Sequence, residues 1–311
     1  MSELHAQVQA WAKINLDLRI LAREESGFHQ IETIFQRISL ADAIDLRVTT
    51  GAGIALTCAP PVNVPASRNL AYRAAAAYRA AAEWPASDRC IQIAITKHIP
   101  TGAGLGGGSA DAGAVLRALN ALNPAPLPAT TLLTIAATLG ADVPFLTSER
   151  AAALAWGRGE RLFALPPLPR RELLLATFRD GVNTALAYRA LAEWRARGDV
   201  AAVGSVMHDA PALGDWNSIT QLARNDFEGP VFALRPDILA VYRALSSSAP
   251  TALVRMSGSG ATVFAIFATP SSAVANAPTP WPASAQITPV HAATLQQVPA
   301  VAILAPTSRP R

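Results

Sequence analysis

The stretch of sequence that decides the fold is rich in glycine and reads Pro100-Thr101-Gly102-Ala103-Gly104-Leu105-Gly106-Gly107-Gly108-Ser109-Ala110-Asp111. An alternating apolar run at residues 89–99 precedes it and predicts a strand, and a helical pattern at residues 112–122 follows it. Glycine lets a backbone adopt positive φ angles and come close to a ligand. A helix that starts after such a loop presents unpaired N–H groups and the positive end of its dipole at one point. The stretch is therefore predicted to bind an anion, which we interpret as a nucleotide triphosphate.

Three kinds of phosphate-binding loop compete for this stretch. A Walker A loop needs a lysine, but Gly102 is followed by Gly107-Gly108-Ser109 without one. The dinucleotide pattern Gly-x-Gly-x-x-Gly is present, yet residues 112–141 contain no Asp or Glu to bind a ribose. The His-Arg-Asp and Asp-Phe-Gly motifs of protein kinases are missing as well. A flexible linker is disfavoured, because strand and helix patterns flank the loop closely.

Composition limits the class of protein. A length of 311 residues predicts two domains, and 51% hydrophobic with 15% charged residues is typical of a globular chain. The sequence has no apolar run long enough for a membrane span, no signal pattern, and two cysteines that form neither a disulfide framework nor a zinc motif. These features predict a cytoplasmic protein. The net charge of +4 comes without a basic run, so no nucleic acid or membrane partner is expected.

The first part of the chain predicts strands. Residues 8–20 alternate with period two, and 31–40 and 44–48 predict two further strands separated by residues 41–43. On the first strand one face is apolar, and the other carries Lys13, Asn15 and Asp17. Alone, that polar face is typical of a strand surface exposed to solvent. Lys13 and Lys97 are the only lysines of the chain.

The remaining elements alternate between helices and strands. Helices are predicted at residues 69–84, 112–122, 130–139, 184–197, 217–227 and 236–246, and strands at 151–156, 161–163, 172–178, 252–256 and 262–268. The proline-rich segment 165–170 predicts a boundary between domains at residues 1–165 and 171–311.

The glycine stretch resembles the second motif of the GHMP kinase superfamily, and its triple glycine resembles the branch of 4-diphosphocytidyl-2-C-methyl-D-erythritol kinases, which act in isoprenoid precursor synthesis. Five more segments resemble that family and follow its order along the chain. They are Ala12-Lys13-Ile14-Asn15-Leu16, Gly27-Phe28-His29, Gly140-Ala141-Asp142-Val143-Pro144-Phe145, Asn225-Asp226-Phe227-Glu228 and Ser257-Gly258-Ser259-Gly260-Ala261.

The resemblance implies an α+β fold of two domains. The N-terminal domain would be of the ribosomal protein S5 domain 2-like kind and the C-terminal domain ferredoxin-like, with the active site in the cleft between them. It also implies ATP and Mg²⁺ as cofactors, a small-molecule cytidylyl substrate phosphorylated on its 2-hydroxyl, and a monomer or homodimer.

The same resemblance implies roles for individual residues. Asp142 would be the general base and Lys13 its electrostatic partner, because phosphoryl transfer needs a proton acceptor and charge neutralisation. Ser109 would contact Mg²⁺ in addition to phosphate. The residues implied to bind the nucleotide are Asn69, Leu70, Lys97, Pro100, Thr101, Gly102, Ala103, Gly104, Leu105, Gly106, Gly107, Gly108, Ser109 and Ala110. Those implied to bind the acceptor are Asn15, Phe28, His29, Tyr188, Gly258, Ser259 and Gly260.

Within the acceptor set, His29 would contact the edge of the cytosine and Tyr188 would stack on its ring. Three alternatives stay open at this point: another GHMP kinase, of the homoserine or mevalonate type; a nucleotide-binding regulator without catalysis; and a Rossmann oxidoreductase.

Overall fold

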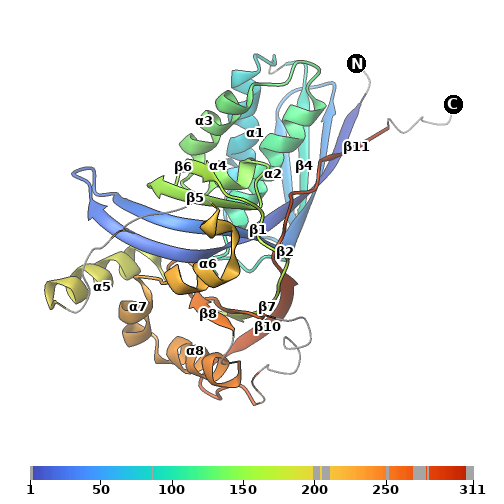
Figure 1. Cartoon of the computed structure of the whole chain (residues 1–311). Coiled ribbons are helices and arrows are strands. Elements are labelled where there is room, and N and C mark those ends of the chain that lie inside the picture. The colour runs from blue at the N-terminus through green and yellow to red at the C-terminus, as the bar shows by residue number, and fades with distance from the viewer. Residues whose placement is uncertain are drawn as a thin grey trace.

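The computed structural model describes residues 3–85, 87–198, 204, 211–249, 252–268, 278 and 280–305. Within these residues the chain forms two β-sheets, of seven and four strands, and helices pack against each (Figure 1). Two long, curved N-terminal strands separate the two parts of the molecule in this view. The mixture of helices and sheets confirms the predicted α+β class.

The first sheet is built around the N-terminal strand pair. Its members are β1 (Leu4–Arg23), β2 (His29–Thr49), β3 (Ile54–Ala59), β4 (Cys90–Thr96), β5 (Ala152–Gly157), β6 (Arg161–Ala164) and β11 (Ala302–Leu304). The order is β11-β1-β2-β4-β3, and β5 and β6 extend the sheet from the other half of β2. Its helices are α1 (Leu70–Ala81), α2 (Gly107–Leu122), α3 (Ala129–Leu139) and α4 (Val143–Thr147), with a 3-10 turn, η1, at Ala66–Arg68. The sequence prediction contains no element at β3.

The apolar face of β1 is buried as its alternation predicts, but the expectation of a solvent-exposed polar face is wrong. Lys13, Asn15 and Asp17 are only 4%, 4% and 1% exposed. Two later segments cover this face: Arg224 N–H donates to Asp17 Oδ1 at 3.1 Å, and Gly104 O of the glycine loop accepts from Lys13 Nζ at 3.3 Å. The polar side chains of β1 therefore lie between the two parts of the molecule.

The strand β2 runs without interruption through residues 41–43, so the predicted break there is wrong. One half of β2 pairs with β5 and the other with β4. Asp42 lies in the half that pairs with β4, fully buried, and its carboxylate accepts the backbone N–H groups of His98 and Ile99 and bonds to Lys97 Nζ. A carboxylate satisfied in this way can be buried within a strand.

Two predicted helix boundaries also need correction. Helix α2 begins at Gly107 rather than at residue 112, so the last glycines of the loop form its first turn. The predicted helix 217–227 is confirmed only in its first part, because α6 ends at Leu222 and residues 223–227 are not helical. They pair with β1 instead, and Asp226 N–H donates to Leu18 O at 3.0 Å.

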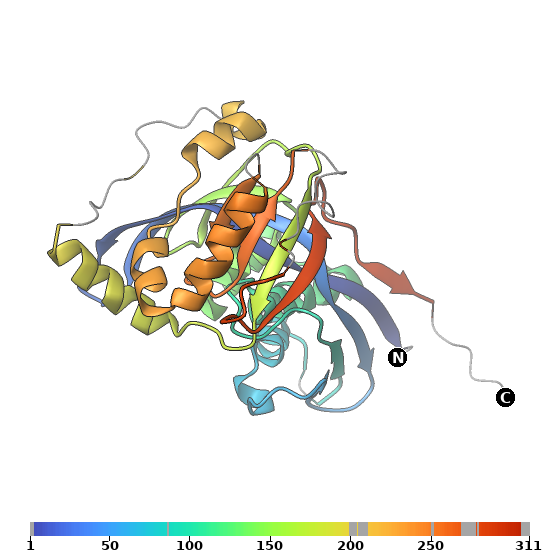
Figure 2. The same cartoon turned by 90° about the horizontal axis from the view of Figure 1, so that it is seen from below.

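The second sheet has the strand order of a ferredoxin-like domain. Its strands are β7 (Glu172–Phe178), β8 (Leu253–Met256), β9 (Val263–Ile266) and β10 (Ile287–Ala293), and the helices of this part are α5 (Thr184–Ala196), α6 (Trp216–Leu222), α7 (Glu228–Leu234) and α8 (Pro236–Ser248), with a 3-10 turn, η2, at Ala212–Gly214. The order is β10-β7-β9-β8, and all pairs are antiparallel. Figure 2 shows helix α8 lying across the sheet.

Strand β7 is buried on both faces. Leu174 and Ala176 pack with helices α5, α7 and α8, whereas Leu173 and Leu175 belong to the core of the first part. The two parts thus share apolar packing, and β11 of the C-terminal tail returns to pair with β1. We retain the division at 165/171 as a proposal, with this last strand crossing it.

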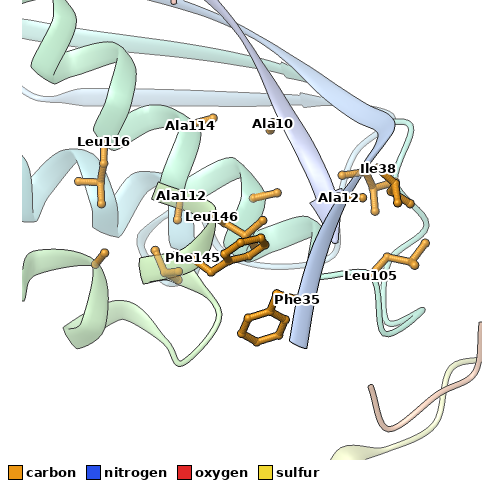
Figure 3. Close-up of a cluster of buried hydrophobic side chains, with 14 of the residues drawn as sticks. Ala10, Ala12, Phe35, Ile38, Leu105, Ala112, Ala114, Leu116, Phe145 and Leu146 are labelled. Atoms are coloured by element: carbon orange, nitrogen blue, oxygen red, sulfur yellow. The ribbon is translucent and has the colours of Figure 1, made fainter. Parts of the chain in front are cut away.

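Helix α4 is fixed in the core between α2 and β2 (Figure 3). The rings of Phe35 and Phe145 stack with centroids 5.0 Å apart, and Arg37, 1% exposed, donates to the carbonyls of Phe145 and Ser148 at 2.8 Å. Burial lowers the pKa of the Arg37 guanidinium to about 9. On the other side, Gly113 of α2 meets the backbone of α4 so closely that a Cβ there would lie 2.4 Å from Leu146 O.

The contact between α2 and α4 predicts the effect of a single methyl group. Gly113→Ala is expected to destabilise the fold by about 1–3 kcal/mol through overpacking. Helix propensity alone predicts the opposite sign, a gain of about 1 kcal/mol. Urea denaturation measures the difference in free energy of unfolding.

Gly108→Ala on the same helix is the matched control. Its added methyl would have Leu70 Cδ1 3.8 Å away, an ordinary contact, so the variant should be as stable as the wild type or more stable by up to about 1 kcal/mol from helix propensity. A Gly113→Ala protein as stable as the wild type would contradict the close approach of the two helices.

Candidate active site

The glycine stretch joins β4 to α2 and leaves the start of the helix open. Gly102, Gly104 and Gly106 have φ angles of 73°, 78° and 73°, the left-handed region that glycine adopts without strain. Ala110 N–H bonds to Gly106 O at 2.8 Å, so the three N–H groups before it have no acceptor inside the helix. This arrangement fits the predicted anion site.

A second glycine turn, residues 257–261, packs against the glycine loop at Gly104. Ser257 Oγ donates to Gly104 O at 2.9 Å, and a Cβ at position 104 would lie 2.4 Å from Ser257 O. Only glycine fits this contact. The turn that follows β8, with Gly258 and Ser259, is thereby brought next to the phosphate loop.

Lys13 lies directly beneath the loop. Its backbone N–H donates to Leu105 O at 3.0 Å, and its Nζ donates to Asn15 Oδ1 at 2.8 Å and to Gly104 O at 3.3 Å. The side chain is 5% exposed. The ammonium is therefore buried and held by oxygen atoms.

Asp142 faces Lys13 across a small cavity. Its Oδ2 lies 3.4 Å from Lys13 Nζ, and its side chain is 30% exposed. Although Asp142 precedes α4, its side chain does not cap that helix. The carboxylate is left to face the cavity, with the lysine on one side and solvent on the other.

The nucleotide-side residues line a cavity of about 360 Å³. It is bordered by the loop, by Lys97 and by the start of α1, where Asn69 and Leu70 lie. The side-chain oxygen Oδ1 of Asn69 is already used, since it accepts Ala71 N–H at 2.9 Å as the cap of α1. Leu105 and Ala110 do not line this cavity, because their side chains, both 1% exposed, pack in the core.

Lys97 forms a buried triad with Asp42 and Asp111, which the sequence analysis did not identify. Its Nζ bonds to Asp42 and lies 2.7 Å from Asp111 Oδ2. Burial raises the pKa of the Asp111 carboxyl to about 7, and the Lys97 ammonium opposes the rise. Asp42 and Asp111 each interrupt an apolar run, which indicates that they are buried. The surrounding sequence does not indicate that they contact Lys97.

The acceptor-side residues line a larger cavity of about 1060 Å³. Its wall includes Phe28, His29, Tyr188 and Arg158. The rings of His29 and Tyr188 stack on each other, with centroids 4.2 Å apart and planes 18° apart. One face of Tyr188 is therefore covered by His29. Burial and then the charge of Asp142 raise the pKa of Tyr188 to about 12.

Phe28 is 57% exposed, and one face of its ring is covered by the guanidinium of Arg158, 4.0 Å from the ring centroid. Burial, followed by the charges of Arg23 and Arg195, lowers the pKa of the His29 imidazole below its usual value. His29 is thus neutral at pH 7 and can both donate and accept hydrogen bonds.

A third cavity, of about 340 Å³, connects the other two and contains Lys13 and Asp142. It shares Gly104, Gly106 and Ser109 with the nucleotide side. With the acceptor side it shares Ala141, Arg158, Thr184 and Tyr188. The arrangement can carry out transfer from an anion on the glycine loop to a group in the large cavity, past a lysine and a carboxylate.

The predicted acceptor residues Asn15, Gly258 and Ser259 also line this connecting cavity. Gly260 does not line it; its Cα faces Met256 and Val182. Sequence reasoning missed Thr184, whose hydroxyl lies 3.1 Å from Ser259 Oγ, and Arg158, which borders two of the cavities.

Neither a metal cage nor a membrane span is found in the part of the chain that the structure describes. No group of three or more His, Cys, Asp or Glu side chains there could hold a metal ion. In the same residues, no helix is long and apolar enough to cross a bilayer.

Comparison with known proteins agrees with this geometry. Residues 69–150 match the GHMP kinases N terminal domain, and residues 206–277 match the GHMP kinases C terminal model. A 4-diphosphocytidyl-2-C-methyl-D-erythritol kinase of Solibacter usitatus is 40% identical over 266 residues, which cover 85% of this chain and 81% of that protein. The protein of the same name from Moorella thermoacetica is 39% identical over 270 residues, 83% of this chain and 89% of its own length.

Solved structures give the same result. A crystal structure of a 4-(cytidine 5'-diphospho)-2C-methyl-D-erythritol kinase matches with a TM-score of 0.68 and 34% identity, over 93% of this chain and 98% of that one. A homoserine kinase from Cytophaga hutchinsonii matches with a TM-score of 0.67 at 17% identity, over 98% of both chains, which shows a shared fold alone. The predicted two-domain fold and the predicted resemblance are confirmed. The chain therefore belongs to the GHMP kinase superfamily and is an ATP-dependent small-molecule kinase.

Proposed function

We propose that the chain transfers the γ-phosphoryl group of ATP to the 2-hydroxyl of 4-diphosphocytidyl-2-C-methyl-D-erythritol. The observation that carries the proposal is the line of three cavities, with Lys13 and Asp142 in the middle one. The relatives that are 34–40% identical bear the name of this kinase, which supports the choice of acceptor.

In the proposed reaction, Asp142 is the general base. The acceptor hydroxyl gives its proton to the Asp142 carboxylate as the hydroxyl oxygen forms a bond to the γ-phosphorus. The bond between the γ-phosphorus and the bridging oxygen breaks, and ADP leaves with that oxygen. A carboxylate within hydrogen-bond reach of the hydroxyl is what this step requires.

Lys13 supplies charge at the same place. Its ammonium lies 3.4 Å from Asp142 Oδ2, so a positive charge stands beside the carboxylate that receives the proton. It also stabilises the negative charge that develops on the attacking oxygen. Because Asn15 Oδ1 and Gly104 O hold Nζ in place, the charge is oriented before substrate binds.

The proposal includes a Mg²⁺ ion, which would lie where the nucleotide cavity meets the connecting cavity. Mg²⁺ bound to a nucleotide takes one or two protein oxygens and several phosphate oxygens and waters, so a complete protein cage is not needed. Ser109 lines both cavities, and its hydroxyl makes no hydrogen bond to any described residue. It is the protein oxygen proposed to contact the ion, which would neutralise charge on the phosphates.

An assay of ATP consumption over a panel of acceptors tests the proposed function. We expect turnover with the cytidylyl methylerythritol and none with homoserine or mevalonate. Turnover of homoserine or mevalonate alone would assign another GHMP kinase activity, and turnover of no acceptor would contradict the proposal.

The catalytic pair predicts the behaviour of two variants. Asp142→Asn and Lys13→Ala should each lower kcat by about 10²-fold or more, because each removes a group that acts in the transfer step. Steady-state kinetics measure kcat, and circular dichroism confirms folding. Asp88→Asn is the control and should keep wild-type kcat, because Asp88 is exposed and lines none of the three cavities. Near wild-type turnover by a folded Asp142→Asn protein would contradict its assignment.

The neutral state of His29 predicts a pH dependence. Since its pKa is lowered, the imidazole stays neutral down to below about pH 6.5, and protonation then removes its acceptor nitrogen. We expect kcat/KM for the cytidylyl acceptor to fall on the acid side of that pH, measured over pH 5 to 8.

Two comparisons isolate the histidine. A loss in the transfer step itself lowers kcat/KM for ATP and for the acceptor alike, whereas protonation of His29 lowers it for the acceptor only. The glutamine of His29→Gln forms hydrogen bonds but does not titrate. In this variant kcat/KM for the acceptor should fall at acid pH no more than kcat/KM for ATP. The same fall in His29→Gln would show that another group causes it.

A further inference from the structure

Arg158 occupies the border between the large cavity and the cavity of Lys13 and Asp142. It lies in the turn between β5 and β6, and its side chain is 42% exposed. Three arginines, Arg23, Arg158 and Arg189, line the large cavity within the described residues. Of these only Arg158 also lines the connecting cavity.

The guanidinium of Arg158 is held in a defined plane by the loop between β1 and β2. Its Nη2 donates to Glu24 Oε2 at 2.6 Å and to Ser26 Oγ at 3.3 Å. One face lies over the Phe28 ring at 4.0 Å. Its Nη1 makes no hydrogen bond to any described residue, so part of the donor fork is unused.

The pair between Arg158 and Glu24, which also includes a bond from Nε to Glu24 Oε2 at 3.2 Å, is accessible to a competing anion because its side chains are 42% and 25% exposed. It is exposed to solvent, and ion pairs of this kind contribute little to stability. A phosphate oxygen can replace the carboxylate and use two N–H groups of the guanidinium at once. The Phe28 ring would keep the guanidinium plane in position during that exchange.

The proposed acceptor carries a negatively charged diphosphate in its middle portion, which would lie near Arg158. It carries cytosine at one end, the hydroxyl to be phosphorylated at the other, and a diphosphate between them. His29 lines the large cavity, and Asp142 lines the connecting one. A molecule that reaches from one to the other passes Arg158 with its middle portion.

We propose that Arg158 binds the diphosphate of the acceptor, exchanging Glu24 for phosphate oxygens, and so selects cytidine diphosphate compounds over neutral cytidine compounds. The inference rests on the proposed function, because it takes the acceptor from there. It assigns Arg158 to substrate binding and leaves the transfer step to Lys13 and Asp142.

A different role for Arg158 would follow from the same contacts. Its bonds to Glu24 and Ser26 could serve only to fix the loop that carries Phe28 and His29. In that case removing Glu24 would have the same effect as removing Arg158, and cytidine would lose affinity as much as cytidine diphosphate.

Isothermal titration with cytidine diphosphate and with cytidine separates these roles. The nucleotide cavity is first saturated with a non-hydrolysable ATP analogue. Arg158→Gln should weaken binding of cytidine diphosphate by about tenfold to a hundredfold, the loss of charge-assisted hydrogen bonds, and leave cytidine within about twofold. Glu24→Gln should bind cytidine diphosphate as tightly as the wild type or more tightly, because a competing carboxylate is gone.

Arg161→Gln is the matched control, since Arg161 is an exposed arginine three residues further on that lines neither cavity. It should leave both affinities unchanged. In kinetics, Arg158→Gln should raise KM for the acceptor and leave KM for ATP unchanged.

Each outcome has one meaning. Equal losses for cytidine and cytidine diphosphate in Arg158→Gln, shared by Glu24→Gln, would overturn the inference in favour of the loop-fixing role. Unchanged affinities in Arg158→Gln would overturn it too, with the proposed function intact. A wild-type protein that binds neither ligand would overturn the proposed function and the inference together.

Discussion

The hydrogen bond from Lys13 N–H to Leu105 O ties the middle of β1 to the glycine loop, and the site depends on this connection. It places an ammonium under the point where the start of α2 offers its unpaired N–H groups. The loop is held from the other side by Ser257, which fits only because position 104 has no Cβ. A phosphate-binding loop is usually described as flexible because of its glycines, yet here the glycines allow close packing that fixes it.

Charge burial is the second constraint on this molecule. Both lysines of the chain are buried next to carboxylates, Lys13 beside Asp142 and Lys97 between Asp42 and Asp111. An ammonium taken out of water is costly unless oxygen atoms surround it. The two lysines meet that condition in different ways: the partner of Lys13 is partly open to a cavity, while the partners of Lys97 are almost fully buried. The first arrangement leaves a carboxylate free to act on a substrate, and the second fixes the strand that enters the loop.

The sequence predicted those features that local patterns determine. The alternation of β1 and the glycine loop are such patterns. The family order of the motifs added the fold class and the expected pair of Lys13 and Asp142, two residues far apart in the chain. What the sequence could not reveal depends on distant contacts. The polar face of β1 is typical of solvent exposure until the glycine loop covers Lys13 and Arg224 covers Asp17. The Lys97 triad joins Asp42 of β2, Lys97 just after β4 and Asp111 of α2.

Local patterns also misplaced some boundaries. Glycine disfavours a helix interior, so propensity put the start of α2 after Asp111, whereas the anion site needs the glycines inside its first turn. The stack of His29 on Tyr188 was not predicted, because α5 and the β1–β2 turn meet only in the folded chain. Arg158 was missed for the same reason, since nothing in the residues around it points to the cavities that it borders.

A crystal structure of the ternary complex would show whether nucleotide and acceptor meet at Asp142, as proposed. With a non-hydrolysable ATP analogue and 4-diphosphocytidyl-2-C-methyl-D-erythritol bound, the distance from the acceptor 2-hydroxyl oxygen to the nearer Asp142 carboxylate oxygen can be measured. We expect this distance to be about 2.6–3.2 Å, within hydrogen-bond reach, with the γ-phosphate on the side of the glycine loop. A 2-hydroxyl that lies beyond the reach of Asp142 in a complete ternary complex would contradict the proposal.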